Sequence, residues 1–193
     1  MEPALIITTL NSIAPLEQGA IAAFLDLCEE ISIPRNEYLV RQGERTPYAY
    51  FLEEGVVRVF FNNEGNEYNK TFFVPGMFPT PITALISGEP SQLGFQALVA
   101  SKLTRFSYQG FRALFKSHPC LESLMLRILE LEWIKKERHD IRMVTNDATT
   151  NYLVFRKEYP GLENQIPQYH IASYLGITPI QLSRIRARLA KGQ

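Results

Sequence analysis

The sequence predicts an α+β protein with an N-terminal antiparallel β jelly roll, one long helix and a C-terminal helix-turn-helix domain of the winged-helix type. Three observations support this order. Short β-rich segments follow one another between residues 31 and 107, and a helical pattern runs from 119 to about 145. Two short amphipathic runs joined by a glycine turn then follow near the end. We therefore expect three parts, at residues 1–117, 118–146 and 147–193.

The predicted strands are short, rich in β-branched and aromatic residues, and separated by turn signals. A helical pattern over residues 15–30 precedes them, and Asn62–Glu67 has the composition of a hairpin loop. Seven or eight such segments within about 80 residues are typical of an antiparallel barrel or jelly roll. The clearest segments are Ile31–Ile33, Tyr38–Arg41, Ala49–Leu52, Val56–Phe61, Tyr68–Val74, Leu93–Val99 and Leu103–Ser107.

The long helical pattern, which follows a short helix at Gln109–Ser117, carries an apolar stripe. Its first part has the 3-4-3 spacing of a coiled-coil seam. The stripe can pack on the jelly roll of its own chain or pair with a second copy, and we expect it to do both. Its members are Leu121, Leu124, Ile128 and Leu131, continued less regularly by Ile134, Ile141 and Val144.

The segment from Ile166 to the C-terminus has the form of a helix-turn-helix. A third helix at about Ala148–Tyr159 and a short strand at Gln165–Pro167 are expected to precede it. Helical runs at 168–175 and 179–189 meet at a glycine turn, and the second run is basic. Thr178 and Pro179 have the residue types of an N-cap and a first helical position. A basic second helix after a tight turn is typical of proteins that place that helix in the DNA major groove.

Charge is distributed unevenly along a chain whose net charge is zero. Residues 151–193 hold six basic and two acidic residues, whereas the remainder holds 14 basic and 18 acidic ones. A basic end on a mildly acidic protein fits a DNA-facing domain.

The order of elements and three motifs resemble the Crp/Fnr family of bacterial transcription regulators. The motifs are Arg41-Gln42-Gly43-Glu44, the run YFLEEGVVRV from Tyr50 to Val59, and IASYLGIT from Ile171 to Thr178. The resemblance extends from about Leu16 to Leu189. It implies a cyclic-nucleotide-binding-like sensor domain, a dimerising helix, a homodimer, a small-molecule effector and an operator in double-stranded DNA. RNA polymerase remains an open partner, since no residue pattern identifies a contact patch for it.

The candidate DNA-binding residues lie on and around the second helix of the motif. Early positions of such a helix meet base edges, so Gln181 and Arg184 are the candidates for reading adenine and guanine. Ile180 and Arg188 lie on the same exposed face. Four further residues are expected to contact phosphates, which position the protein without specifying sequence. These are Gln168, Tyr169, Thr178 and Arg186.

The predicted sensor departs from its relatives at the nucleotide-binding cassette. In those relatives a glycine-glutamate pair meets the ribose and cyclic phosphate, and an arginine-serine pair neutralises the phosphate. Aligned through Gly76, Phe78 and Gly88, these places hold Thr80-Pro81 and Ser91-Gln92. The carboxylate and the guanidinium are both missing, so cyclic AMP is not expected to bind in the usual way.

A less polar effector remains an alternative to an empty core. Thr80, Pro81, Ser91, Gln92 and Phe73 are the candidate pocket residues, in a part of the chain rich in phenylalanine. Those phenylalanines can equally be the core that such strands require.

Other classes of protein fit the sequence less well. Two cysteines 92 positions apart cannot hold an iron–sulfur cluster, and all three histidines follow the barrel region, which disfavours haem and a metal-binding cupin enzyme. We therefore expect no metal, no cofactor and no enzyme activity. No signal peptide or membrane helix is predicted, so a cytoplasmic location is expected. The remaining alternatives are a protein-interaction module without DNA binding and a regulator with a non-standard cyclic-nucleotide pocket.

Overall fold

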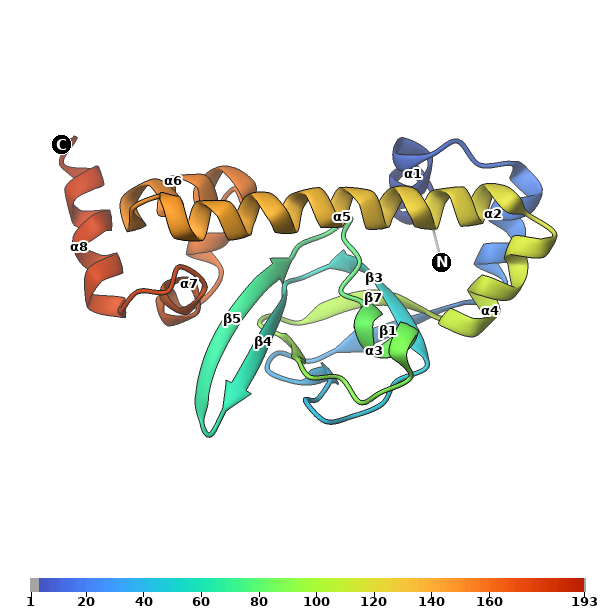
Figure 1. The fold of residues 1–193 in the computed structure, drawn as a ribbon, viewed down its shortest axis with the longest axis horizontal. Coiled ribbons are helices and arrows are strands. Elements are labelled where there is room, and N and C mark those ends of the chain that lie inside the picture. The colour runs from blue at the N-terminus through green and yellow to red at the C-terminus, as the bar shows by residue number, and fades with distance from the viewer. Residues whose placement is uncertain (1–3, 193) are drawn as a thin grey trace.

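The computed structural model describes residues 4–192 and contains two antiparallel sheets packed as a jelly roll beside one long helix (Figure 1). The limits predicted at residues 1 and 193 lie outside the described residues. One sheet has the strand order β1-β7-β3 and the other β2-β6-β4-β5. The strands are β1 (Cys28–Ile33), β2 (Tyr38–Val40), β3 (Tyr48–Glu54), β4 (Val57–Asn63), β5 (Asn66–Phe73), β6 (Gly94–Ala97) and β7 (Ser101–Ser107).

The predicted jelly roll is confirmed, and its core lies between the two sheets. Val57 and Val59 of β4 point between the two sheets, where they meet Leu52 and Leu103 from the opposite sheet. Their neighbour Arg58 points to the outer face, as the two-residue period of a strand requires. The turn from β3 to β4 depends on Gly55, whose φ is +103° and where an added Cβ would lie 2.1 Å from the Ser101 Oγ atom.

The β4–β5 hairpin turns at Glu64 and Gly65, which both have positive φ values (52° and 90°). Two successive positive φ values match the twist of a two-residue hairpin. β5 is an edge strand of its sheet, and its register against β4 shifts between Val59 and Phe60. Lys70 is the extra residue of this bulge, since Thr71 pairs with Val59 and Asn69 with Phe60.

Several helices differ from the sequence-based expectation. The predicted helix over 15–30 ends early, because Cys28 pairs with Phe106 as the start of β1. A helix before it and one inside the cassette region were not predicted, and the expected strand at Gln165–Pro167 is wrong. The helices are α1 (Ala4–Ile13), α2 (Gln18–Leu25), α3 (Ile82–Ser87), α4 (Tyr108–Ala113), α5 (Pro119–Thr145), α6 (Ala148–Glu158), α7 (Gln168–Tyr174) and α8 (Pro179–Ala190), with 3₁₀ turns η1 (Leu114–Lys116) and η2 (Leu162–Asn164).

The long helix α5 has two different halves. At its start, Leu121 and Leu124 are fully buried against α1, α2 and the jelly roll, so they belong to the core of their own chain. Further along, a set of large apolar side chains lies exposed, with Trp133 at 67% and Val144 at 84%. The exposed set also includes Leu126, Leu131, Ile134, Ile141 and Met143.

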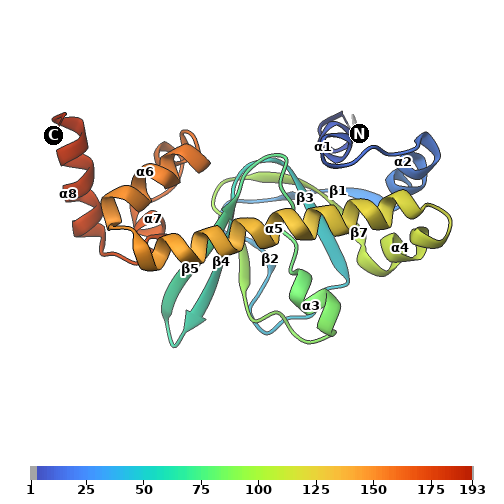
Figure 2. The same ribbon diagram turned by 45° about the horizontal axis from the view of Figure 1, so that its top comes forward.

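The C-terminal helices form a small unit that packs on α5 and on the β4–β5 hairpin (Figures 1 and 2). α6 runs back along the end of α5, tied by an ion pair between Arg142 and Glu158 at 2.6 Å. α7 lies between β5 and α8 in both views. The described residues of this unit are all helical or loop, so the strands of the expected wing are absent from residues 146–192.

Candidate nucleic-acid interface

The turn between α7 and α8 has the geometry that a helix-turn-helix needs. Gly176 follows α7 with a φ of +67°, and its N–H donates to Ser173 O at 3.2 Å. The next N–H, from Ile177, donates to Ala172 O at 3.0 Å. This pair of hydrogen bonds is the Schellman motif, which favours glycine because the left-handed conformation strains other residues.

The two helices are held at a fixed crossing by a shared apolar core. Ile171 and Leu175 of α7 are buried against Leu182 and Ile185 of α8. These four side chains point inward, so the opposite face of α8 is left toward solvent.

That outer face of α8 carries the predicted DNA-reading residues. Ile180, Gln181, Arg184 and Arg188 are all exposed. Neither Arg184 nor Arg188 has an ion-pair partner among residues 4–192, so both guanidinium groups are available to an anion.

Gln181 has a second task that the sequence analysis missed. Its Oε1 atom accepts a hydrogen bond from the Thr178 N–H at 2.9 Å, and Thr178 Oγ1 accepts from the Gln181 N–H at 3.2 Å. The two residues form a capping box, which the spacing Thr-x-x-Gln could have revealed. While the cap is closed, only the Nε2 donors of the Gln181 amide remain for a base.

Arg186 and Gln168 face their own domain around Glu163. Glu163 pairs with Arg156 at 3.0 Å and lies 3.9 Å from Arg186 Nε, and it accepts a hydrogen bond from the Tyr152 hydroxyl. Burial, followed by this bond, raises the pKa of Tyr152 to about 12. Gln168 donates from Nε2 to Glu163 O at 2.7 Å, and its buried Oε1 has no partner within the described chain.

The remaining predicted phosphate contacts are placed differently. Tyr169 is exposed on α7, with its ring 4.1 Å from that of His170. Thr178 is exposed, but its hydroxyl serves the cap of α8. The structure thus gathers Ile180, Gln181, Arg184 and Arg188 on one face, and sets Gln168 and Arg186 apart from it.

The predicted effector residues are satisfied by their own chain. Thr80 Oγ1 accepts from Tyr50 N–H at 2.9 Å and lies 3.1 Å from Tyr50 O. The buried Ser91 hydroxyl donates to Leu93 O at 2.8 Å. Pro81 precedes α3, Gln92 is exposed, and Phe73 is half-buried against the core between the sheets.

The phenylalanines near the cassette do not converge on one cavity. Phe78 packs on Phe51 with ring centroids 5.0 Å apart, and Phe95 lies between the sheets. Phe72 faces the C-terminal helices instead. A hollow of about 410 Å³ lies elsewhere, on the outer face of β2 and β4, and contains none of the predicted effector residues; it is lined by Tyr38, Arg41, Gln42, Phe60, Asn62, Glu64 and Gly65.

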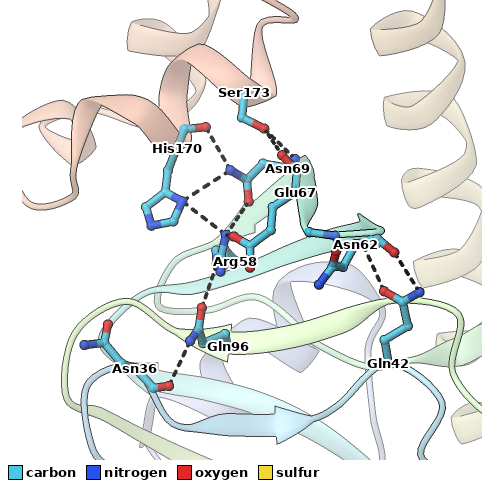
Figure 3. A network of polar contacts seen from close by, with 10 residues as sticks. Asn36, Gln42, Arg58, Asn62, Glu67, Asn69, Gln96, His170 and Ser173 are labelled. Carbon is cyan, nitrogen blue, oxygen red and sulfur yellow. Dashed lines mark hydrogen bonds and ion pairs between the residues drawn. The ribbon is translucent and has the colours of Figure 1, made fainter. Parts of the chain in front are cut away.

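A polar network that the sequence did not suggest joins the sensor domain to α7 (Figure 3). Arg58 of β4 is 4% exposed and donates from Nη1 to Nδ1 of His170 at 3.2 Å. Asn69 of β5 donates to His170 O at 3.1 Å. Burial and the nearby Arg58 charge lower the pKa of His170 to about 4, so its ring is neutral and its Nδ1 accepts.

Neither a metal site nor a membrane helix is present in the part of the chain that the structure describes. No three His, Cys, Asp or Glu side chains gather there into a group that could bind a metal ion. None of the helices within residues 4–192 combines the length and the apolar character that crossing a membrane requires.

Comparison with known proteins gives consistent similarities. Residues 30–118 match the family model described as Cyclic nucleotide-binding domain. The chain is 25% identical over 182 residues to the cAMP-activated global transcriptional regulator CRP of Salmonella typhimurium, covering 89% of this chain and 87% of that protein.

Two solved structures share its fold. The c-di-GMP responsive global regulator CLP of Xanthomonas campestris gives a TM-score of 0.71 at 16% identity, covering 91% of this chain and 93% of that one. FixK2 of Bradyrhizobium japonicum gives 0.72 at 19% identity, covering 86% and 85%. The chain thus resembles regulators of the Crp/Fnr type along most of its length. The resemblance seen in the sequence is therefore confirmed, and the chain shares the fold of these solved structures over most of its length.

Proposed function

We propose that this Crp/Fnr-type protein is a homodimeric, DNA-binding transcription regulator that reads the major groove with α8. The observation that carries the proposal is the exposed, cationic face of α8 on a complete helix-turn-helix. Arg184 and Arg188 have no ion-pair partner among the described residues. Unpaired guanidinium groups on such a helix suit guanine edges and phosphates.

We assign the roles within the interface from the groups of each side chain that are not already bonded within the protein. Arg184 is one turn into α8 and free, so we assign it to a guanine. Gln181 would read a base acceptor through its Nε2 donors while its Oε1 stays in the cap. Ile180 is exposed and apolar, which suits a thymine methyl group. Arg188 and Tyr169 would meet phosphates.

The exposed second half of α5 supports the dimer. Large apolar side chains including Trp133 and Val144 are exposed there, and exposed apolar patches on a helix mark sites of association with another chain. A second copy packed along this half would bury the stripe, while Leu121 and Leu124 stay in the core of each chain.

The sensor domain is proposed to lack the usual response to cyclic AMP. The relatives include a regulator named as cAMP-activated, but here the cassette offers Thr80 and Ser91, whose hydroxyls already bond to the backbone. The place of the family's arginine is held by Ser91, which brings no guanidinium to a cyclic phosphate. Since the relatives are named as regulators, we propose no enzyme activity, and we propose a cytoplasmic location because the proposed DNA partner would be met there.

Binding to random-sequence DNA tests the central proposal. Full-length protein should enrich specific duplexes from a random pool, and binding should weaken steeply with salt because phosphates are contacted. The double variant Arg184→Ala/Arg188→Ala should lose the enriched duplexes, whereas Arg112→Ala, an exposed arginine on α4, should not. A wild-type chain that enriches nothing and shows no salt-sensitive binding would favour a protein-interaction module instead.

Two solution measurements test the finer parts. Sedimentation equilibrium should give a dimer at micromolar concentration, and Trp133→Lys should shift it toward monomer. Isothermal titration with cyclic AMP should show no binding at micromolar concentration. Tight binding that is lost in Ser91→Ala would instead indicate a non-standard nucleotide pocket.

A further inference from the structure

The contact between the jelly roll and α7 combines a buried apolar layer with a polar network (Figure 3), in which the Arg58, Asn69 and His170 side chains are buried. Arg58 lies at the centre of the polar part. Its Nε donates to Gln96 Oε1 at 2.7 Å, and its Nη1 pairs with Glu67 at 2.5 Å and donates to His170 at 3.2 Å. Every charged or polar side chain in this group has a partner, which a buried guanidinium requires.

Ser173 connects α7 to the free edge of β5. Its hydroxyl donates to Glu67 O at 2.9 Å and accepts from Asn69 N–H at 3.0 Å. Both backbone groups belong to an edge strand, so the side chain takes the place that a neighbouring strand would occupy. The Asn69 side chain adds a bond to His170 O at 3.1 Å, so α7 is held at two successive turns.

The apolar layer lies beside this polar group. Phe72 of β5 is fully buried and meets the rings of Phe155, Tyr159 and Tyr174 at 6.0, 5.9 and 5.5 Å. Thr71 Oγ1 also lies 3.1 Å from the Tyr159 hydroxyl. An apolar layer tolerates small rotations, whereas directional bonds to a planar guanidinium permit one orientation.

The docking leaves the DNA-reading face free. α7 lies between β5 and α8 in both views, so α8 is on the far side from the sheet (Figures 1 and 2). Arg184 and Arg188 stay exposed while His170 and Arg58 are buried. The contact therefore fixes the orientation of the reading helix without covering it.

We propose that Arg58, Asn69 and His170 are positioning residues for DNA binding, which lock the helix-turn-helix on the β4–β5 hairpin so that a dimer presents its two α8 helices at one fixed spacing. The inference rests on the proposed function. The lock consists of side-chain and backbone groups of this chain. Spacing matters because two linked half-sites bind far more tightly than one only when the geometry lets both engage.

The test uses full-length protein and duplexes that the wild type enriches from a random pool. Affinity is measured for the enriched two-half-site duplex, for versions with one or two base pairs inserted between the half-sites, and for a single half-site. His170→Ala and Arg58→Gln should weaken binding to the two-half-site duplex about tenfold or more. Their binding to the single half-site should stay within about twofold of wild type, and their preference for the original spacing should flatten.

Matched variants separate positioning from general damage. His170→Asn keeps an acceptor near the place of Nδ1, so it should restore the affinity and the spacing preference. Arg105→Gln removes an arginine that pairs with Glu29 on the other sheet, at 2.8 Å, and should change neither. Hydrogen exchange of the β5 backbone reports the lock without DNA, because the Asn69 N–H is bonded to Ser173. It should quicken in His170→Ala and not in Arg105→Gln.

The outcomes are distinct. Faster β5 exchange in His170→Ala with unchanged affinity and unchanged spacing preference would overturn the inference and leave the proposed function standing. Tighter DNA binding by His170→Ala and Arg58→Gln than by the wild type would also overturn it, because the contact would then inhibit DNA binding. If wild-type protein enriches no DNA, the proposed function fails and the inference fails with it. If His170→Ala does not fold, the same affinities and hydrogen-exchange rates are measured for Arg58→Gln and Ser173→Ala.

Discussion

The two helices of the helix-turn-helix lie side by side but meet opposite environments. α7 turns His170 and Ser173 into the sensor domain, where every polar group is paired and the imidazole is neutral. α8 turns Arg184 and Arg188 to solvent, where they have no ion-pair partner among residues 4–192. The orientation of α7 is fixed by its contacts with the sensor domain, whereas the outer face of α8 is free to contact a partner. Substitutions on α7 should therefore act on stability and orientation, and those on α8 on DNA binding.

The largest expected effect is on the α7 side. Phe72→Ala removes a fully buried ring that three aromatic side chains contact, so it should lower the free energy of unfolding by about 3–5 kcal/mol. Urea denaturation monitored by circular dichroism measures this. Phe61→Ala, on an exposed ring of the same hairpin, is the control and should change stability by less than about 0.5 kcal/mol.

The second effect depends on pH. His170 has a folded-state pKa of about 4 against an ordinary value of 6.5, because burial and Arg58 oppose its protonation. The unfolded chain therefore takes up the proton first as the pH falls. The stability from this residue is complete above about pH 7, declines between 6.5 and 4, and is lost below that range. The loss is about 3 kcal/mol at most.

The measurement is the free energy of unfolding at pH 7 and at pH 4.5, for wild type and for His170→Asn. Arg58, Glu67 and Tyr169 are the ionisable groups that face the imidazole, and all three remain in the variant. The decline should be markedly smaller in His170→Asn. An equal decline in both proteins would show that other groups carry the pH dependence.

A third effect is expected on α8. Arg184→Ala should weaken binding to an enriched duplex by about 1–3 kcal/mol and relax the preference at one base pair. Arg188→Ala should weaken binding to all duplexes alike and reduce the slope of log affinity against log salt by about one. Both variants should unfold at the wild-type denaturant concentration. A stability loss as large as that of Phe72→Ala would break the contrast between the two helices.

The smallest effect concerns the start of α8. Thr178→Ala opens the capping box and should cost about 1 kcal/mol of stability. The bond from the Thr178 backbone N–H to Gln181 Oε1 can persist in this variant, because alanine keeps that N–H. Gln181→Ala should show a comparable loss of the cap together with weaker DNA binding, and comparing the two variants separates the capping role from base reading.

Much of the fold could be predicted because its signals are local. The β-rich run Val56–Phe61 identified a strand, and Gly176 identified the turn between helices. The end of the first predicted helix could not be placed from the sequence. Cys28 begins β1 because it pairs with Phe106, which lies 78 positions further along the chain. Its own burial raises the pKa of the Cys28 thiol to about 12. Competition between local periodicity and distant pairing sets such boundaries.

The candidate site was predictable in part for the same reason. The exposed face of α8 follows from helical spacing, and the capping box was readable from Thr178 and Gln181. The contact of Arg58 with His170 was not, because the two residues are 112 positions apart and an arginine at an outward strand position ordinarily meets solvent. Only the docking of a second domain makes that position an interior one.

The bond from Ser173 to the edge of β5 has one more consequence. Edge strands with free N–H and C=O groups are templates for association with other chains. In the intact protein, α7 occupies the Glu67 and Asn69 backbone groups and covers Phe72. A chain cut after α5 would present that backbone and that ring together to water. The C-terminal unit is thus also a cover against edge-to-edge aggregation, and an isolated sensor fragment should precipitate or form β-paired multimers where the whole chain does not.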